Sequence, residues 1–209
     1  MATIDILDNV NNEIDLTTIP SLEIDNYDLF DFEELKFDFD ELFISVDENS
    51  TNFKLDENFI NQKRIDYLEQ KITPLLISLI KNEDFEFGKK NETVKLIEQQ
   101  LEFNSVATQN WFNKLYIKYF ASDEKILIGL LRIVESLNET SLHPTGEIMA
   151  IAALSHKNDE VKELGVRIFE NWCSLHSYEI LKSIKVETVW LQEYITQVIK
   201  DIEIELCLY

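Results

Sequence analysis

The chain contains only four glycines and three prolines in 209 residues, and this scarcity restricts how often it can turn. Sheets with many strands need frequent tight turns, in which these two residues are the usual choice. Hydrophobic residues make up 45% of the chain and charged residues 28%, which is enough to build a substantial core. We therefore expect a mainly α-helical protein with long helices and short connections.

Helical periodicity begins at about residue 56 and continues to the end of the chain. Apolar residues recur every three or four positions, and each run follows a residue that commonly begins a helix. The predicted starts are Asp56 or Asn58, Asn91, Ser105, Ser122, Thr145, Asn158, Ser174 and Glu187. Pro74 is expected either to kink the first helix or to begin a second, short one. Short connections predict antiparallel packing of neighbouring helices.

One of these helices resembles the second helix of a HEAT or armadillo-type repeat. Such helices begin with an acidic cap, then valine, then a basic residue, and later carry a small residue where the paired helix approaches. These roles fall to Asp159, Val161, Lys162 and Gly165. The resemblance, over roughly residues 90–205, implies stacked helix pairs with a curved face for macromolecules.

A second copy of this opening lies 36 residues earlier, at Ser122 and Gly129, which is close to the repeat length of helical solenoids. The copies lose register by one residue after the glycines, where Arg132 lies opposite Arg167. We expect antiparallel helix pairs stacked as a short HEAT-like solenoid, or an ordinary helical bundle with two similarly capped helices.

Negative charge is concentrated at the start of the chain. The net charge is −21, and residues 1–60 contribute −15 of it, with 17 acidic residues against two lysines. Nucleic acids and anionic membrane surfaces would be repelled by such a chain. We therefore expect a basic protein partner, no direct nucleic-acid binding and no membrane association.

Residues 1–55 form an acidic, aromatic-containing segment that we separate from the helical domain at 56–209. Short alternating apolar pairs favour partly extended chain, and residues 42–55 have the pattern of a hairpin. The stretch 28–43 fits either a helix or a strand, and we favour a short helix. Its carboxylates would orient a basic partner while its phenylalanines fill pockets. The alternative is that these phenylalanines pack onto the helical domain.

The residues predicted to bind the partner are acidic or aromatic and all lie in this segment. They are Asp25, Asp28, Phe30, Asp31, Glu33, Glu34, Phe37, Asp38, Asp40 and Glu41. Lys162 and Arg167 are further candidates, but only if a HEAT-like concave surface exists.

Motifs for catalysis are scarce. The chain has no glycine-rich phosphate loop, no GxSxG and no HExxH. Its two cysteines lack CxxC spacing, and among its three histidines only His176 has a cysteine, Cys173, three residues away. That pair is weak evidence for a nucleophile. We expect no enzyme, no cofactor and no metal site.

Localisation and function follow from the same composition. No apolar run approaches the eighteen or so residues of a membrane span, and the N-terminus lacks the pattern of a signal peptide. We expect a cytoplasmic inhibitor or immunity-type protein that masks a basic toxin or nucleic-acid-acting protein. The alternatives are a scaffold or adaptor whose acidity only solubilises it and, third, an enzyme using Cys173 and His176.

Overall fold

The computed structural model describes residues 57–83 and 91–207, and this part of the chain is mainly α-helical, as predicted. No strand occurs within these two ranges. The acidic N-terminal segment, its expected hairpin and the boundary at residue 55 lie outside the described residues. The helices are α2 (Glu57–Tyr67), α3 (Thr73–Asn82), α4 (Glu92–Phe103), α5 (Ser105–Phe120), α6 (Glu124–Ser136), α7 (Thr145–Ala153), α8 (Asp159–Trp172), α9 (Leu175–Ser183) and α10 (Val189–Glu205).

Pro74 lies in the first turn of α3, and a π-helical turn, Leu68–Ile72, joins α3 to α2. The flanking residues Tyr67 and Ile72 keep right-handed helical dihedrals, so the chain stays helical from α2 to α3. A π turn accommodates proline because it rearranges the hydrogen bonds that the ring interrupts. Pro74 therefore begins a helix, as one of the two alternatives predicted, while the helical path continues through it.

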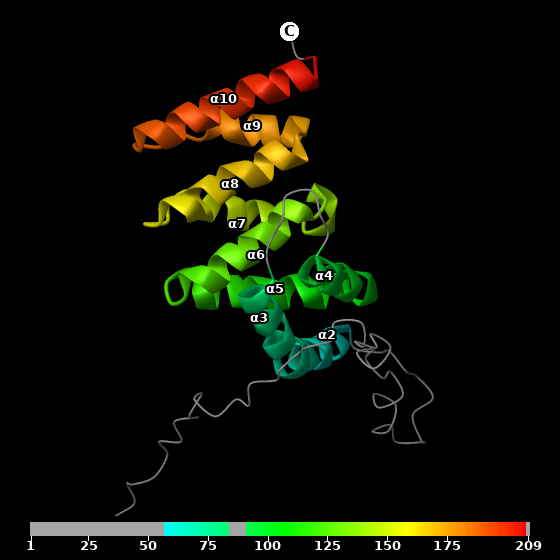
Figure 1. Cartoon of the computed structure of the whole chain (residues 1–209). Coiled ribbons are helices and arrows are strands. Elements are labelled where there is room, and N and C mark those ends of the chain that lie inside the picture. Colours follow the sequence, from blue (N-terminus) through cyan, green and yellow to red (C-terminus); the bar gives the residue numbers. More distant parts are fainter. Residues whose placement is uncertain (1–56, 84–90, 208–209) are drawn as a thin grey trace, which may run out of the picture. The chain divides into compact units, whose positions relative to one another are not determined.

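Helices α5 to α10 pack as successive antiparallel pairs in two layers (Figure 1). Helices α6, α8 and α10 follow one another in one layer, and α5 and α7 lie in the other with α9. Each pair, α5 with α6, α7 with α8 and α9 with α10, is also in contact. Helices α2 to α4 pack against α5 and α6 at the N-terminal end of this arrangement.

Four helix starts are capped by side chains at or close to the predicted positions, including α9, where Ser174 Oγ accepts from the backbone N–H of Ser177 at 2.9 Å, as predicted. Asn104 Oδ1 accepts from the backbone N–H of Ala107 at 2.9 Å, and Asp123 Oδ1 accepts from Ile126 at 3.2 Å. Asn158 caps α8 as predicted, accepting from Glu160 at 2.8 Å. The predicted start Ser105 lies one residue after the actual cap, Asn104, and the predicted start Ser122 lies one residue before the actual cap, Asp123. The caps of α6 and α8, Asp123 and Asn158, are therefore 35 residues apart.

Two other helix starts are not capped as predicted. Asn91 precedes α4 but makes no capping bond; instead the Glu83 carboxylate at the end of α3 accepts from the backbone N–H of Glu92 at 2.7 Å and of Thr93 at 3.0 Å. A carboxylate suits this place because the helix dipole is positive there. Thr145 is the first residue of α7 and not its cap.

The glycines inside α6 and α8 are positions of close packing. A Cβ at Gly165 would lie 2.7 Å from the backbone oxygen of Ala150 in α7, the paired helix. A Cβ at Gly129 would lie 2.3 Å from Ile80 Cγ2 in α3. Gly165 therefore lies where the paired helix, α7, approaches closely, as the resemblance implied. Gly129 instead allows close approach of α3, which is not the helix that α6 pairs with.

Several hydrogen bonds between the α5–α6 pair and the α7–α8 pair join residues 33 to 36 apart in sequence. Tyr116 donates to the backbone oxygen of Met149 at 2.9 Å, and Trp172 Nε1 donates to that of Leu137 at 2.9 Å. These bonds satisfy polar groups in or beside the core, where an unpaired group would cost stability. They fix α7 and α8 against the preceding pair.

Candidate functional site

The ten acidic and aromatic residues predicted to bind a partner, between Asp25 and Glu41, all lie outside the described residues. Partner binding by this segment therefore stays a prediction. Within the described ranges, three features can be compared with the sequence analysis: the charged face of α6, α8 and α10, a groove on α10, and a cluster of two histidines and a glutamate between α7 and α9.

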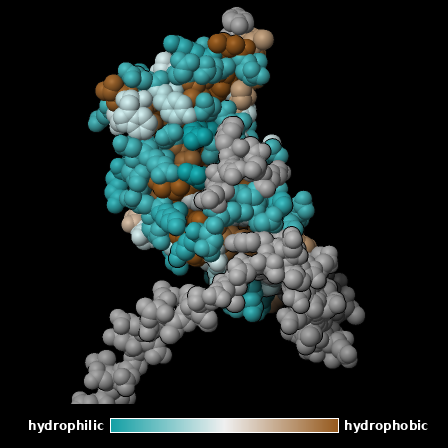
Figure 2. Space-filling view, in the orientation of Figure 1, coloured by the Kyte–Doolittle hydropathy of each residue, from teal (hydrophilic) through white to brown (hydrophobic). Residues whose placement is uncertain are grey.

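The face formed by α6, α8 and α10 is mostly hydrophilic, with apolar atoms visible between the helices (Figure 2). Ion pairs cross it. Arg132 of α6 lies 3.0 Å from Glu160 of α8, and Arg167 of α8 lies 3.4 Å from Glu135 of α6. Tyr194 of α10 donates to Glu170 of α8. Side chains of opposite charge on α6 and α8 therefore pair across this face and join the two helices.

Lys162 and Arg167, the two basic residues suggested for partner contact, both lie on α8 and both already have carboxylate partners. Lys162 Nζ lies 2.8 Å from Asp159, and its side chain is only 15% exposed. Arg167 also lies 3.8 Å from Glu163. Burial raises the pKa of Glu135, although Arg167 opposes this shift. These groups are less available to a partner than the sequence alone suggests.

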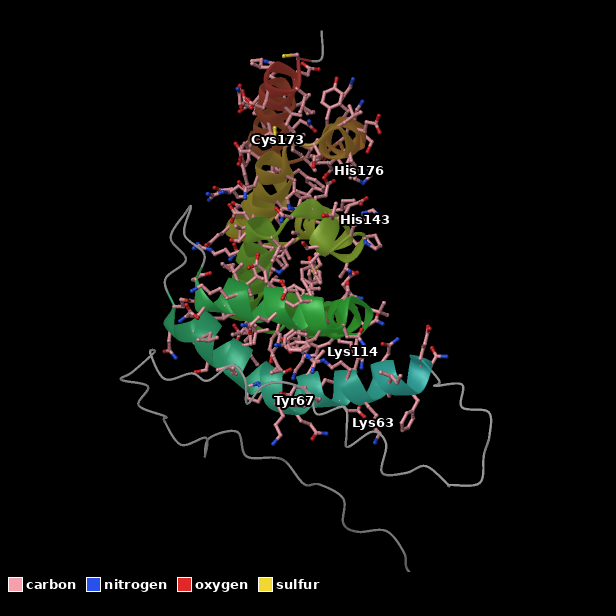
Figure 3. The ribbon with its side chains drawn as sticks, turned by 90° about the vertical axis from the view of Figure 1, so that its right-hand side faces the viewer. Lys63, Tyr67, Lys114, His143, Cys173 and His176 are labelled. Atoms are coloured by element: carbon pink, nitrogen blue, oxygen red, sulfur yellow. The ribbon has the colours of Figure 1, made fainter. Side chains whose placement is uncertain are left out.

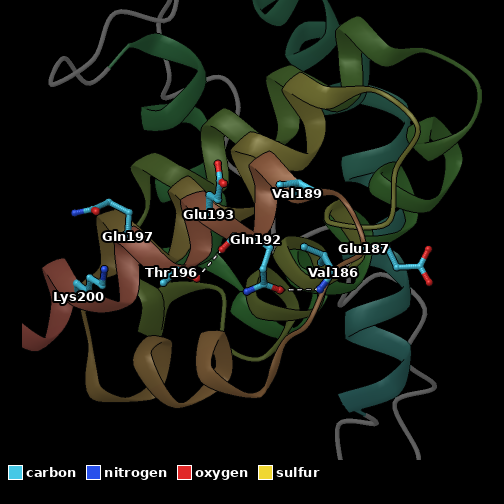
Figure 4. Close-up of a pocket in the computed structure, with 8 residues that line it drawn as sticks. All are labelled: Val186, Glu187, Val189, Gln192, Glu193, Thr196, Gln197 and Lys200. Atoms are coloured by element: carbon cyan, nitrogen blue, oxygen red, sulfur yellow. Dashed lines mark hydrogen bonds between the residues drawn. The ribbon is translucent and has the colours of Figure 1, made fainter.

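The groove on α10 has a volume of about 440 Å³ and opens on the last helix of the described part (Figure 4). Its lining mixes apolar, amide and charged side chains of both signs: Val186, Glu187, Val189, Gln192, Glu193, Thr196, Gln197 and Lys200. Gln192 Oε1 accepts from the backbone N–H of Val186 at 3.0 Å, which ties the connection before α10 to the helix. The lining contains no histidine or cysteine.

His143, Glu147 and His176 meet where α7 and α9 begin (Figure 3). His176 Nε2 lies 2.9 Å from Glu147 Oε2, and His143 Nδ1 lies 3.5 Å from the same oxygen. The two imidazole rings are 6.0 Å apart between centroids and nearly perpendicular. The one nitrogen or oxygen atom that each residue contributes lies within 4.8 Å of the other two.

The surroundings of this cluster are acidic. The hydrogen bond that His176 donates to the Glu147 carboxylate, together with the nearby carboxylates of Glu139 and Glu179, raises the pKa of His176. Sequence reasoning did not find the cluster. His143 and Glu147 are four residues apart, a spacing that brings side chains together in helices. Nothing local connects them to His176, which is 29 residues beyond Glu147.

The stability contributed by the His176–Glu147 pair is expected to depend on pH. Because the pKa of His176 is higher in the folded state, the pair stabilises the fold fully below the unfolded value of about 6.5. This contribution disappears as the pH rises through the folded pKa. Both groups are partly exposed, so H176Q should lower the free energy of unfolding by only about 0.2–1 kcal/mol at pH 5.5 and by almost nothing at pH 8.5.

Urea denaturation at the two pH values, with a chelator present, measures this difference. In an E147Q background the pH dependence of the H176Q effect should become much smaller, because only the contributions of Glu139 and Glu179 to the pKa of His176 remain. An H176Q effect that is equal at both pH values would contradict the assignment.

Within the described residues, Cys173 and His176 interact with different neighbours. His176 is engaged with Glu147 of α7, whereas Cys173 ends α8, and desolvation together with Glu205 of α10 raises its pKa. A raised pKa disfavours the thiolate, the reactive form of cysteine. The third histidine, His156, is buried; its Nε2 bonds the backbone oxygen of Phe120 at 2.9 Å and its Nδ1 accepts from the Asn158 N–H at 3.0 Å. It therefore has a structural role.

Comparisons with protein-family models, with curated proteins and with solved structures gave no significant match to this chain. Within residues 57–83 and 91–207, no helix combines the length and apolar character that crossing a membrane requires.

Proposed function

We propose that this chain is a non-enzymatic protein-binding protein, an inhibitor or immunity-type protein that masks a basic partner such as a toxin or a nucleic-acid-acting protein. The observation that carries the proposal is the charge distribution: residues 1–60 contribute −15 of the net −21. Clustered like charge destabilises a compact fold, and such clusters often serve as interaction elements. A cationic cleft is the complementary surface.

The proposed contact combines two kinds of interaction. Asp31, Asp38 and Asp40 speed encounter with the cationic surface and fix its orientation. Phe30 and Phe37, interleaved with them, supply apolar anchors, and such anchors usually provide most of the affinity at an interface. Together they place the binding site in the N-terminal segment.

The helical domain is proposed to be HEAT-like. Support comes from the successive antiparallel pairs α5–α6, α7–α8 and α9–α10 and from several hydrogen bonds, all between the first two pairs, that join residues 33 to 36 apart. Gly165, at the close approach of α7 and α8, fits the same interpretation. Proteins of this architecture present extended surfaces to macromolecules.

A scaffold or adaptor role is the second candidate, and the hydrophilic face of α6, α8 and α10 favours it (Figure 2). On that interpretation, the acidic segment only solubilises the chain, and the partner contacts exposed groups of α8 such as Glu160, Glu163 and Glu170. The two candidates therefore differ in which carboxylates matter.

Two full-length variants that lose the same number of charges separate these candidates. One carries D31N, D38N and D40N, and the other carries E160Q, E163Q and E170Q. A partner is first captured from the native host's lysate, identified by mass spectrometry and purified. Its affinity for each variant is then measured by calorimetry at low and high salt. An inhibitor should bind a basic partner, and the N-terminal variant should weaken binding by roughly tenfold.

The α8 variant is the matched control, because its net charge equals that of the N-terminal variant. For an inhibitor it should bind within about twofold of the unmodified chain, and binding should weaken with salt. The opposite pattern, with loss only in the α8 variant, would support the adaptor role. Equal losses, or a partner that is not basic, would contradict the inhibitor proposal.

A further inference from the structure

We propose that His143, Glu147 and His176 bind one divalent transition-metal ion, with zinc as the preferred occupant. The site lies between α7 and α9 (Figure 3). It shares no residue with the proposed partner-binding segment, so the two proposals are independent. The metal site would join the segment that leads into α7 to the first turn of α9, two elements that are 29 or more residues apart in sequence.

The geometry is close to that of a bound ion. Ligand atoms around a tetrahedral zinc ion lie about 3.3 Å apart, given metal–ligand bonds of about 2.0–2.1 Å. Glu147 Oε2 is 2.9 Å from His176 Nε2 and 3.5 Å from His143 Nδ1. All three atoms lie within 4.8 Å of one another, so small side-chain rotations would bring them around one ion. Two imidazoles and one carboxylate form a zinc-binding set that leaves a fourth position for water.

The electrostatics also favour a cation. Besides Glu147, the carboxylates of Glu139 and Glu179 act on His176. Glu139 Oε1 is buried and has no hydrogen-bond partner within the described part of the chain. A buried carboxylate oxygen without a partner is costly, and a nearby cation would offset that cost. Glu139 therefore adds negative charge near the site, while the ligand atoms that lie within 4.8 Å of one another belong to His143, Glu147 and His176.

The ligand types select the metal. Imidazole nitrogens suit zinc, cobalt and nickel, whereas magnesium and calcium prefer oxygen ligands. The imidazoles are also reachable from solvent: the His143 and His176 side chains are 57% and 47% exposed, and that of Glu147 is 21% exposed. Only neutral imidazole binds a metal, so protons compete with the ion and affinity should fall as the pH is lowered.

Calorimetric titration of the full chain with zinc at pH 7.5, in excess magnesium, tests the proposal. Magnesium occupies exposed carboxylates, which a chain with 40 acidic residues has in abundance. We expect one zinc ion per chain. H143Q, E147Q and H176Q should each weaken binding by roughly 10- to 100-fold or more, since even outer-shell changes have effects of that size. Cobalt should give visible d–d absorption that H176Q abolishes.

Two control variants test other sources of binding. E193Q removes an exposed carboxylate on α10, away from the cluster, and should bind zinc like the unmodified chain. C173S/C207S removes both thiols and should also leave the affinity unchanged. Circular dichroism checks that each variant keeps its helices. We expect that it does, because the substituted side chains are partly exposed.

Thermal unfolding gives an independent readout. Zinc at one hundred times the dissociation constant of the unmodified chain should raise its Tm by about 5–10 °C, and the same zinc concentration should raise the Tm of H176Q by about half as much or less. Zinc binding that survives all three ligand substitutions, or that disappears in excess magnesium, would overturn the proposal. A loss of affinity in C173S/C207S equal to that in H176Q would also overturn it, because the site would then involve thiols.

Discussion

Replacing Trp111 with alanine is expected to lower the free energy of unfolding by about 3–5 kcal/mol, because the ring fills the junction between α5 and the α2–α3 segment. Trp111 is fully buried. Its Nε1 donates to Thr73 Oγ1 at 2.9 Å, and this hydroxyl in turn donates to the backbone oxygen of Leu68 at 3.1 Å. The substitution therefore removes a large apolar group and also the donor that holds α5 to the start of α3.

Trp190 is the matched control for this prediction. It is the same residue type on α10 but is 38% exposed, and W190A should cost about 1 kcal/mol or less. W111F should fall between W111A and the unmodified chain, because it keeps most of the apolar volume and loses the hydrogen bond. Urea unfolding followed by circular dichroism measures all three. Equal losses in W111A and W190A would show that the α2–α5 junction is not part of the cooperative core.

Substituting Gly165 with leucine is expected to destabilise the chain by at least about 3 kcal/mol. Even a single Cβ would lie 2.7 Å from the Ala150 backbone oxygen, 3.0 Å from Leu154 Cδ2 and 3.1 Å from Ala153 Cβ. Relief requires α7 to move away from α8, since a backbone oxygen cannot rotate aside as a side chain can. Overpacking of this kind costs about 1–3 kcal/mol for small additions, and leucine adds four carbons.

Glu163 supplies a control on the same helix. E163L introduces the same side chain at an exposed position and loses only one long ion pair with Arg167, so it should cost less than about 1 kcal/mol. Thermal unfolding of G165L and E163L compares them directly. A G165L variant as stable as E163L would contradict the close contact between α7 and α8.

The two proposals assign two separate binding functions to the chain, a metal site at the histidine–glutamate cluster and a partner-binding site in the acidic segment. The proposed metal site would tie α7 to α9, whereas the proposed partner contact uses residues 25–41. A zinc-induced rise in Tm without any change in partner affinity is therefore consistent with both proposals. The two sites are tested by different substitutions, so failure of one leaves the other intact.

Several features of the fold could be predicted because their causes are local. The apolar spacing of α6 and α8 and the capping asparagine at Asn158 depend on residues within one or two turns of each other. The same reasoning failed where the hydrogen-bond acceptor that caps a helix comes from the end of another helix. The carboxylate that caps α4 belongs to Glu83, nine residues before the helix begins, so the prediction that Asn91 caps this helix was wrong.

The tryptophans show the same division. Trp111, Trp172 and Trp190 all lie at helical spacing with apolar neighbours, but of these three only Trp111 is fully buried. Trp172 is partly buried and Trp190 is largely on the surface of the last helix. Periodicity identifies the apolar side of a helix, yet it does not say whether another helix covers that side. Position at the end of the layer decided the exposure of Trp190.

The sequence by itself determined the helical class, most helix starts and the concentration of charge at the N-terminus, because these depend on composition and on neighbours along the chain. Only the tertiary structure decided which helix packs closely against Gly129 and Gly165 and which carboxylate caps α4. It alone also brought His143, Glu147 and His176 together. These contacts depend on how successive helix pairs stack, and small changes in that stacking redirect long-range contacts while leaving the local pattern unchanged.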